Sequence, residues 1–110
     1  IKKNGKKFKK RIFTESEVAA CNKRTNNISC FAKRFAAKEA LFKAVGAKNK
    51  LHFRDVEITN NSFGAPNIKI KGKSLSNIKK LFKKKKYKIH LSLSDDKPWA
   101  VASVIIFIYN

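Results

Sequence analysis

The spacing of the apolar residues divides the chain into segments of helical and of strand period. Over about 29–45, apolar side chains recur every three or four residues, which predicts a long helix that ends at Gly46. The same spacing over 74–85 predicts a second helix. Over 89–94, apolar and polar residues alternate, which predicts a half-buried strand.

Capping and turn residues mark the shorter elements. The sequence TESE at 14–17 has the form of a capping box and predicts a short helix over about 14–22. Asparagine, glycine and proline cluster at 60–66, which predicts a turn. The segments on either side of that turn, 56–59 and 67–71, are predicted to be the two strands of a hairpin.

The last predicted strand is the most apolar segment. Trp99–Tyr109 is almost continuously apolar, which is typical of a strand in the centre of a sheet or at a contact between subunits. Helices mixed with antiparallel hairpins indicate an α+β fold. A length of 110 residues indicates a single domain over 1–110.

Composition adds a strong charge imbalance. The chain has 27 Lys and Arg against 7 Asp and Glu, a formal net charge of +20 at pH 7. The partner is therefore expected to be anionic: a nucleic acid, a phosphorylated small molecule, an acidic protein or an anionic membrane. The longest apolar tract, VIIFIY at 104–109, is far shorter than the roughly 20 residues that span a bilayer.

Two cysteines are few for a disulfide framework, and no Cys/His spacing in the chain resembles a zinc site. We therefore expect Cys21 and Cys30 to be reduced, partly buried thiols in a reducing compartment.

One carboxylate of the long predicted helix is conspicuous because acids are scarce. On a helical wheel Glu39 lies at the edge of the apolar stripe, with Lys43 one turn beyond it and Arg34 at the opposite edge. The stripe, which we expect to face the core, consists of Phe31, Phe35, Phe42 and Val45. Two interpretations remain open. An ordinary Glu–Lys surface pair contributes only about 0.2–0.5 kcal/mol. A carboxylate beside the core can instead hold magnesium, which usually takes one or two protein carboxylates together with phosphate oxygens.

Four segments carry a resemblance that covers essentially the whole chain. The most specific is the helix FAKRFAAKEALFKAVG at 31–46, which closely resembles the signature helix of the holo-acyl-carrier-protein synthase family, the short 4'-phosphopantetheinyl transferases. The others follow that family in the right order: RIFTESE at 11–17, ITNNSFGAPNIKI at 58–70 and HLSLSDDKPWAVASVII at 90–106.

The resemblance implies a small α+β unit that forms a homotrimer with its active sites at the subunit interfaces. It implies an enzyme of fatty acid biosynthesis that transfers 4'-phosphopantetheine from coenzyme A to a serine of apo-acyl carrier protein, with Mg²⁺ bridging the pyrophosphate. In that family a second magnesium ligand, an Asp, lies on an N-terminal strand. No acid occurs in residues 1–13, so that strand is expected to precede Ile1.

The family motifs also assign roles to individual residues. By resemblance, Glu39 is a magnesium ligand and catalytic residue, and Lys43 is a catalytic residue that contacts the transferred phosphate. The same comparison assigns further coenzyme A contacts to Arg34, Gly64, Pro66, Ser94 and Asp95.

The resemblance also implies that the basic segment 1–11 docks the acidic carrier protein. The residues expected to contact the carrier are Lys3, Lys7, Lys10 and Arg11. The competing interpretation is a non-enzymatic nucleic-acid-binding domain, favoured by the charge and the polybasic runs. No nucleic-acid-binding signature occurs, so we do not expect a nucleic acid as partner. The basic segment has little apolar content, so we do not expect a membrane either. The expected location is the cytoplasm, or a plastid-type organelle in a eukaryote.

Overall fold

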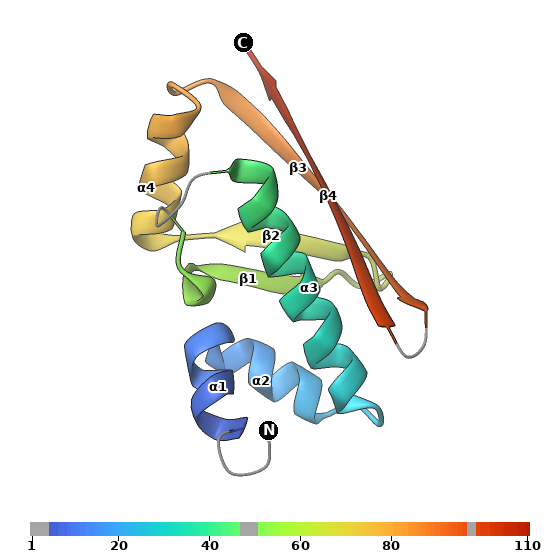
Figure 1. Cartoon of the computed structure of the whole chain (residues 1–110). Helices are drawn as coiled ribbons and strands as arrows, with labels where there is room; N and C mark the ends of the chain where they lie inside the picture. Colours follow the sequence, from blue (N-terminus) through green and yellow to red (C-terminus); the bar gives the residue numbers. More distant parts are fainter. Residues whose placement is uncertain (1–4, 47–50, 97–98) are drawn as a thin grey trace.

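The computed structural model describes residues 5–46, 51–96 and 99–110 and confirms the α+β class (Figure 1). Its helices are α1 (Gly5–Ile12), α2 (Glu15–Asn22), α3 (Asn27–Val45), the short 3-10 helix η1 (Phe53–Asp55) and α4 (Gly72–Leu81). Its strands are β1 (Val56–Asn60), β2 (Pro66–Ile70), β3 (Lys86–Asp96) and β4 (Trp99–Tyr109). None of the helices in these ranges is long and apolar enough to cross a membrane.

Local capping chemistry sets several of the element ends. Thr14 Oγ1 accepts a hydrogen bond from the Glu17 amide at 3.2 Å, and Glu17 Oε1 accepts one from the Thr14 amide at 2.9 Å, so the predicted capping box starts α2. Gly46 ends α3 with a φ of 68°, a left-handed conformation that favours glycine. The helix α4 ends at Leu81, earlier than predicted, because Lys83 and Lys84 that follow have positive φ angles.

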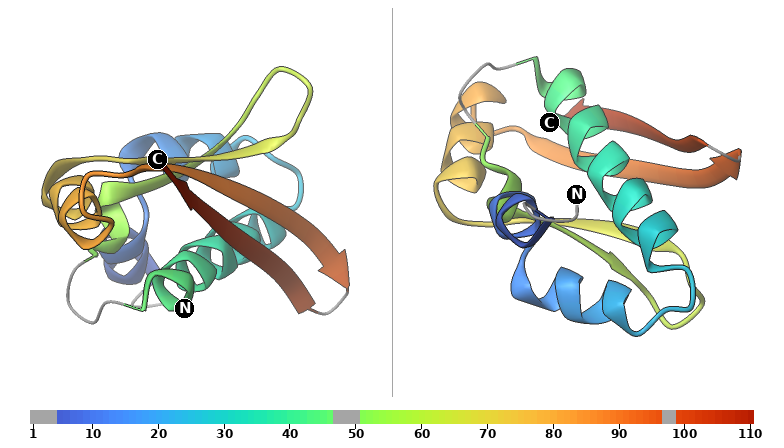
Figure 2. Two further views of the ribbon diagram at one scale, coloured as in Figure 1. Left: turned by 90° about the horizontal axis from the view of Figure 1, so that it is seen from above. Right: turned by 60° about the horizontal axis from the view of Figure 1, so that its bottom comes forward.

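The helix α3 lies in the middle of the fold, with the β1–β2 hairpin and the longer β3–β4 hairpin packed around it and with α1 and α2 at one end (Figure 2). One core cluster joins α3 to both hairpins and α4: Ala37, Leu41, Leu51, Val56, Ile58, Ile78 and Phe82. A second joins α3 to α1 and α2: Ile12, Phe13, Cys21, Cys30 and Phe31.

The buried stripe of α3 differs from the predicted one. Phe31 is buried, but Phe35, Phe42 and Val45 are only half-buried at the margins of the two clusters. The residues that α3 buries are Cys30, Phe31, Arg34, Ala37, Lys38 and Leu41. The prediction considered apolar side chains only. In the structure α3 is rotated so that Arg34 and Lys38 are also buried, because acceptors on other segments accept their hydrogen bonds.

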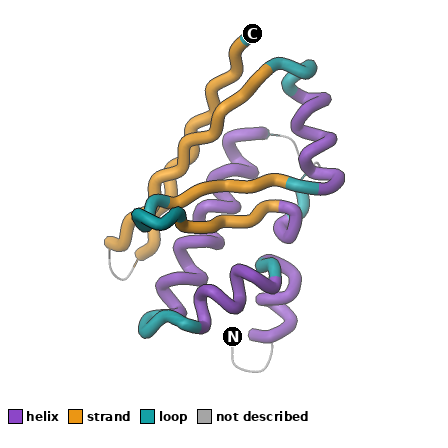
Figure 3. The backbone as a smooth tube through the Cα atoms, turned by 180° about the vertical axis from the view of Figure 1, so that it is seen from behind, coloured by secondary structure: helices purple, strands orange, loops and turns teal. Residues whose placement is uncertain are grey.

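The two hairpins form separate two-stranded sheets, whose strands run in different directions and lie in front of α3 in the view of Figure 3. In the longer one Ile89 pairs with Ile106 and Leu91 with Val104, and these side chains pack on the core. The prediction that Trp99–Tyr109 could be a central strand is wrong, because β4 pairs only with β3 in the described ranges. Its other face exposes a row of large apolar side chains: Trp99, Val101, Ile105, Phe107 and Tyr109.

The expectation of reduced thiols is also wrong. Cys21 and Cys30 form a disulfide with an S–S distance of 2.05 Å. The turn between α2 and α3 brings the last turn of one helix against the first turn of the other, and this proximity is not visible in a cysteine count. Both cysteines are buried in the cluster that holds α1 and α2 against α3.

Reduction of this disulfide is expected to lower the free energy of unfolding by about 2–3 kcal/mol, because the bond closes a short loop and restricts the unfolded chain. Urea unfolding with and without a thiol reductant measures the difference. The Cys21→Ala/Cys30→Ala double variant is the control, since its stability should not respond to the reductant. Equal midpoints for the untreated and reduced protein would contradict the prediction.

Candidate active site

A pocket of about 170 Å³ lies where α3, the β1–β2 turn and β3 meet. Three of the predicted coenzyme A contacts, Arg34, Gly64 and Pro66, line it together. Its other lining residues are Arg24, Cys30, Lys33, Asn60 and Leu93. Several cations therefore surround a small concave space, which suits an anionic ligand.

The turn that forms one wall is held by its own polar groups. Asn61 Oδ1 accepts hydrogen bonds from the amides of Phe63 at 2.9 Å and Ala65 at 3.0 Å. Gly64 has a φ of 84°, which the tight turn requires and which favours glycine. This wall therefore places a backbone segment close to the pocket.

Arg34 lies inside the fold rather than at the edge of an apolar stripe. It is 5% exposed. Its guanidinium donates one hydrogen bond to the Ile58 carbonyl and another to Asn60 Oδ1 at 3.2 Å. Burial lowers the pKa of the Arg34 guanidinium below its ordinary value, and the Glu17 carboxylate opposes that shift. These bonds fix the guanidinium in the pocket wall.

Ser94 and Asp95 follow Leu93, a lining residue, on β3. Ser94 is exposed at this end of the strand, where Val101 of β4 is its partner. The Asp95 side chain is outside what the structure describes, so its predicted contact stays a prediction.

Glu39 and Lys43 lie on a different side of α3 from this pocket. Five positions separate Glu39 from Arg34, which is about 140° round the helix and about 7.5 Å along it. Glu39 is exposed, so the expectation that it borders the core is wrong. The reason is the rotation of α3 that buries its neighbour Lys38. Lys43, one turn on, is exposed as well. The fold therefore does not bring all the predicted site residues of one chain together.

The Glu39 carboxylate fits magnesium only as one ligand among several. The described residues contain no cluster of three or more His, Cys, Asp or Glu side chains that could hold an ion by themselves. Magnesium, however, usually keeps waters and takes phosphate oxygens with one or two carboxylates. The exposed Glu39 carboxylate, one helical turn from Lys43, could supply one ligand to an ion whose other ligands are waters and phosphate oxygens.

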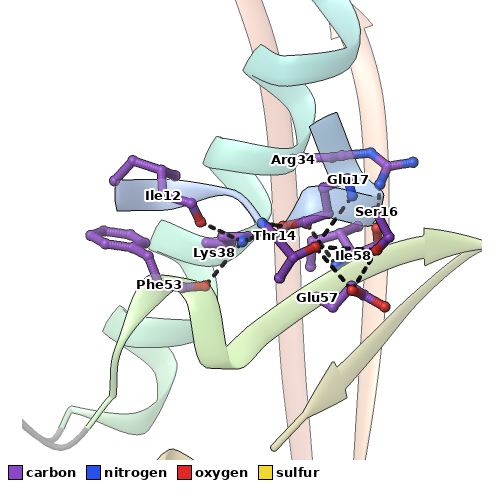
Figure 4. A network of polar contacts seen from close by, with 9 residues as sticks. All are labelled: Ile12, Thr14, Ser16, Glu17, Arg34, Lys38, Phe53, Glu57 and Ile58. Atoms are coloured by element: carbon purple, nitrogen blue, oxygen red, sulfur yellow. Dashed lines mark hydrogen bonds and ion pairs between the residues drawn. The ribbon is translucent and has the colours of Figure 1, made fainter. Parts of the chain in front are cut away.

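A buried polar network surrounds Lys38, the residue that precedes Glu39 in the chain (Figure 4). Lys38 Nζ contacts Glu17 Oε1 at 2.6 Å, and both side chains are fully buried. The ammonium also donates to the carbonyls of Ile12 at 2.6 Å and Phe53 at 2.9 Å. Burial lowers the pKa of Lys38 below its ordinary value, while the hydrogen bond to Glu17 acts in the opposite direction.

Glu57 joins the cap of α2 to β1 at the edge of this network. Its Oε2 accepts hydrogen bonds from Ser16 Oγ at 2.6 Å and Thr14 Oγ1 at 2.9 Å. The hydrogen bond from Ser16 is the main cause that lowers the pKa of the Glu57 carboxyl. These hydrogen bonds attach the start of α2 to β1, the strand whose Ile58 and Asn60 accept hydrogen bonds from Arg34.

The carrier-binding prediction falls on α1. Lys10 and Arg11 are exposed near its end, consistent with an accessible basic surface. Lys3 and the Lys7 side chain are outside what the structure describes. Lys9, another residue of this basic segment, places its ammonium 4.5 Å from the centre of the Phe31 ring.

Sequence reasoning missed the Glu17–Lys38 pair. A signal was present, since Arg34, Lys38 and Leu41 are spaced by four and three residues and so share a helix face. Cations are almost never fully buried unless they are paired, so residue type alone does not predict that Lys38 lies inside the fold.

The fold and site agree with the comparisons. The family model of the 4'-phosphopantetheinyl transferase superfamily matches residues 1–104. The chain therefore belongs to this superfamily of transferase enzymes, which confirms the resemblance. A Zymomonas mobilis protein named holo-[acyl-carrier-protein] synthase is 43% identical over 113 residues, covering 96% of this chain and 81% of that protein.

Solved structures support the same relationship. The crystal structure of holo-[acyl-carrier-protein] synthase from Neisseria meningitidis has a TM-score of 0.78 and 31% identity, and the match covers 99% of this chain and 85% of that one. The enzyme of that name from Bacillus anthracis, solved in complex with CoA (3',5'-ADP), has a TM-score of 0.75 and 32% identity. That match covers 100% of this chain and 87% of the other.

Proposed function

We propose that this chain transfers 4'-phosphopantetheine from coenzyme A to a serine of an apo-acyl carrier protein, in a Mg²⁺-dependent reaction of fatty acid biosynthesis. The observation that carries the proposal is the basic pocket of Arg34, Gly64 and Pro66 in a chain whose Bacillus anthracis relative was solved with CoA (3',5'-ADP). The pocket joins the helix and hairpin motifs that the family signature predicts to contact the cofactor.

Each residue has a defined task in this reaction. Arg34 holds the nucleotide end of coenzyme A through its fixed guanidinium. Glu39 supplies a carboxylate ligand to magnesium, and Lys43 presents a mobile positive charge to the transferred phosphate. When bound, the ion would neutralise charge on the pyrophosphate. The carrier serine attacks the β-phosphate and adenosine 3',5'-bisphosphate leaves.

The test is direct. The purified chain is incubated with apo-carrier protein, coenzyme A and Mg²⁺, and the carrier is weighed by mass spectrometry. A gain of one phosphopantetheine group supports the proposal, and the gain should disappear when Mg²⁺ is chelated. An unmodified carrier in a reaction where a known transferase modifies it would refute the proposed activity.

The active unit is proposed to be a homotrimer with its sites between subunits. Two features support this. Glu39 and Lys43 do not line the pocket that Arg34 lines, as expected if residues of two copies combine in one site. The outer face of β4 exposes large apolar side chains, with Ile105 54% and Phe107 52% exposed, and such a row marks an interaction surface.

The Ile105→Asp/Phe107→Asp double variant is expected to be monomeric and to lose transfer activity by about 10²-fold or more, because half of each site would be missing. Analytical ultracentrifugation gives the mass, and the carrier assay gives the rate. Ile28→Asp is the matched control. Ile28 is 77% exposed at the start of α3, so its replacement should alter neither the mass of the assembly nor the transfer rate. A fully active monomer would contradict the interface assignment.

The basic surface of α1 is proposed to dock the acidic carrier through Lys10 and Arg11, together with Lys3 and Lys7. Such long-range attraction raises the association rate and weakens as salt increases. The proposed location is wherever coenzyme A and an acyl carrier protein occur together, in the bacterial cytoplasm or a plastid-type organelle.

A further inference from the structure

The Lys38 ammonium uses its full donor capacity on three different segments. An ammonium has three N–H donors. Those of Lys38 reach Glu17 Oε1 at 2.6 Å, the Ile12 carbonyl at 2.6 Å and the Phe53 carbonyl at 2.9 Å. These acceptors belong to α2, the end of α1 and η1. One side chain of α3 is therefore attached to three elements at once.

The Glu17 carboxylate extends the connection to β1. Its Oε1 also accepts the Thr14 amide at 2.9 Å, and its Oε2 accepts the Ile58 amide at 2.9 Å. Arg34, one turn before Lys38 on α3, donates to the carbonyl of the same Ile58. Two buried cations of α3 thus hold one residue of β1, Arg34 directly and Lys38 through Glu17 (Figure 4).

Stability does not explain this arrangement. Bringing two charges into the interior costs several kcal/mol per ion before the pair forms, and well-packed apolar residues often replace such pairs without loss. What the pair provides is a defined rotation of α3. A large rotation of α3 would carry Lys38 away from its three acceptors, and in the observed orientation Glu39 is directed about 100° away, to the surface.

We propose that Glu17 and Lys38 are positioning residues, which set the rotation of α3 and so direct the Glu39 carboxylate to the metal. The same pair holds the end of α1, the proposed carrier-docking helix, at a fixed place relative to Glu39. Neither side chain is accessible to a substrate, since both are fully buried. This inference rests on the proposed metal role of Glu39.

The decisive variant removes both charges together. Glu17→Gln keeps one acceptor oxygen for the Thr14 or the Ile58 amide, and Lys38→Met retains a side chain of similar length, so the double variant avoids an unpaired buried charge. Mn²⁺ serves as the probe, and its binding in the presence of coenzyme A is measured by electron paramagnetic resonance. The double variant is expected to bind Mn²⁺ about 10- to 100-fold more weakly, the usual effect of losing the groups that orient a metal ligand.

The control is Ser74→Ala. Ser74 is buried and its hydroxyl donates to Asp55 Oδ2 at 2.8 Å, so the change removes a buried polar contact that does not involve α3. It should reduce stability without changing the Mn²⁺ affinity. A merely structural role for Glu17–Lys38 predicts the same behaviour for both variants, and unchanged Mn²⁺ affinity in the folded double variant would overturn the proposal.

If the double variant does not fold, Glu17→Asp decides the question. It keeps both charges but shortens the reach of the carboxylate by one methylene, which displaces α3 and should weaken Mn²⁺ binding; unchanged affinity again overturns the proposal. A comparison of Mn²⁺ binding by the unmodified protein and by Glu39→Gln tests the metal role of Glu39 separately. If these two bind Mn²⁺ equally, the metal role of Glu39 in the proposed function has failed, and this result is distinct from a failure of the positioning pair alone.

Discussion

The Glu39→Gln variant should lose transfer activity by about 10²–10³-fold, the usual effect of removing one group that stabilises charge in a transition state. Glutamine has nearly the shape of glutamate but no charge, so it is a much weaker ligand for a hard cation. Because Glu39 is exposed, its replacement leaves the packing of α3 unchanged. The rate of carrier modification, measured by mass spectrometry at saturating coenzyme A, checks the prediction.

Glu15→Gln is the matched control for this variant. Glu15 is an exposed carboxylate in the first turn of α2, so the same change of charge is made away from the proposed metal site. It should modify the carrier at close to the original rate. Equal rates for Glu39→Gln and Glu15→Gln would show that the Glu39 carboxylate is not part of the reaction.

The Lys38→Met variant should have the largest effect on stability, a loss of about 3–5 kcal/mol, because it leaves the Glu17 carboxylate buried without its partner. That loss is a large part of the total stability of a small domain. Chemical denaturation followed by circular dichroism measures it.

The Glu17→Gln/Lys38→Met double variant tests the cause of that loss. If the unpaired charge is responsible, the double variant should be more stable than Lys38→Met, since only uncharged polar groups then lack their partners. A single variant that loses less than about 1 kcal/mol would mean that water or another cation reaches Glu17, contrary to its burial.

Local signals in the sequence predicted most of the helices and strands, although α1 and η1 were not predicted and α4 ends earlier than expected. The capping box at Thr14–Glu17 and the glycine after α3 act within a few residues of the chain, so they predicted helix ends that the structure confirms. The alternation over 89–94 predicted the side of β3 that packs on α3, because side chains of a strand alternate between its faces. The signature helix at 31–46 predicted the family, which the comparisons confirm.

The family motifs also predicted coenzyme A contacts for residues far apart in the sequence, and these contacts stay predictions. Arg34, Gly64 and Pro66 were assigned to one ligand from motifs about 30 residues apart, and the structure brings them to one pocket. The roles of Glu39 and Lys43 stay predictions, as does the second magnesium ligand expected before Ile1.

The tertiary structure decided which face of α3 is buried, and with it the direction of Glu39. Periodicity records only where apolar residues recur, whereas the burial of Lys38 depends on acceptors at residues 12, 17 and 53 that the chain brings together only on folding. The Cys21–Cys30 disulfide depends in the same way on the packing of two helix ends. The sequence by itself determined the elements and the family, because those signals are local or carried by residue identity. Only the folded chain decided how α3 is rotated, because a buried charge is stable only where distant segments supply its partners.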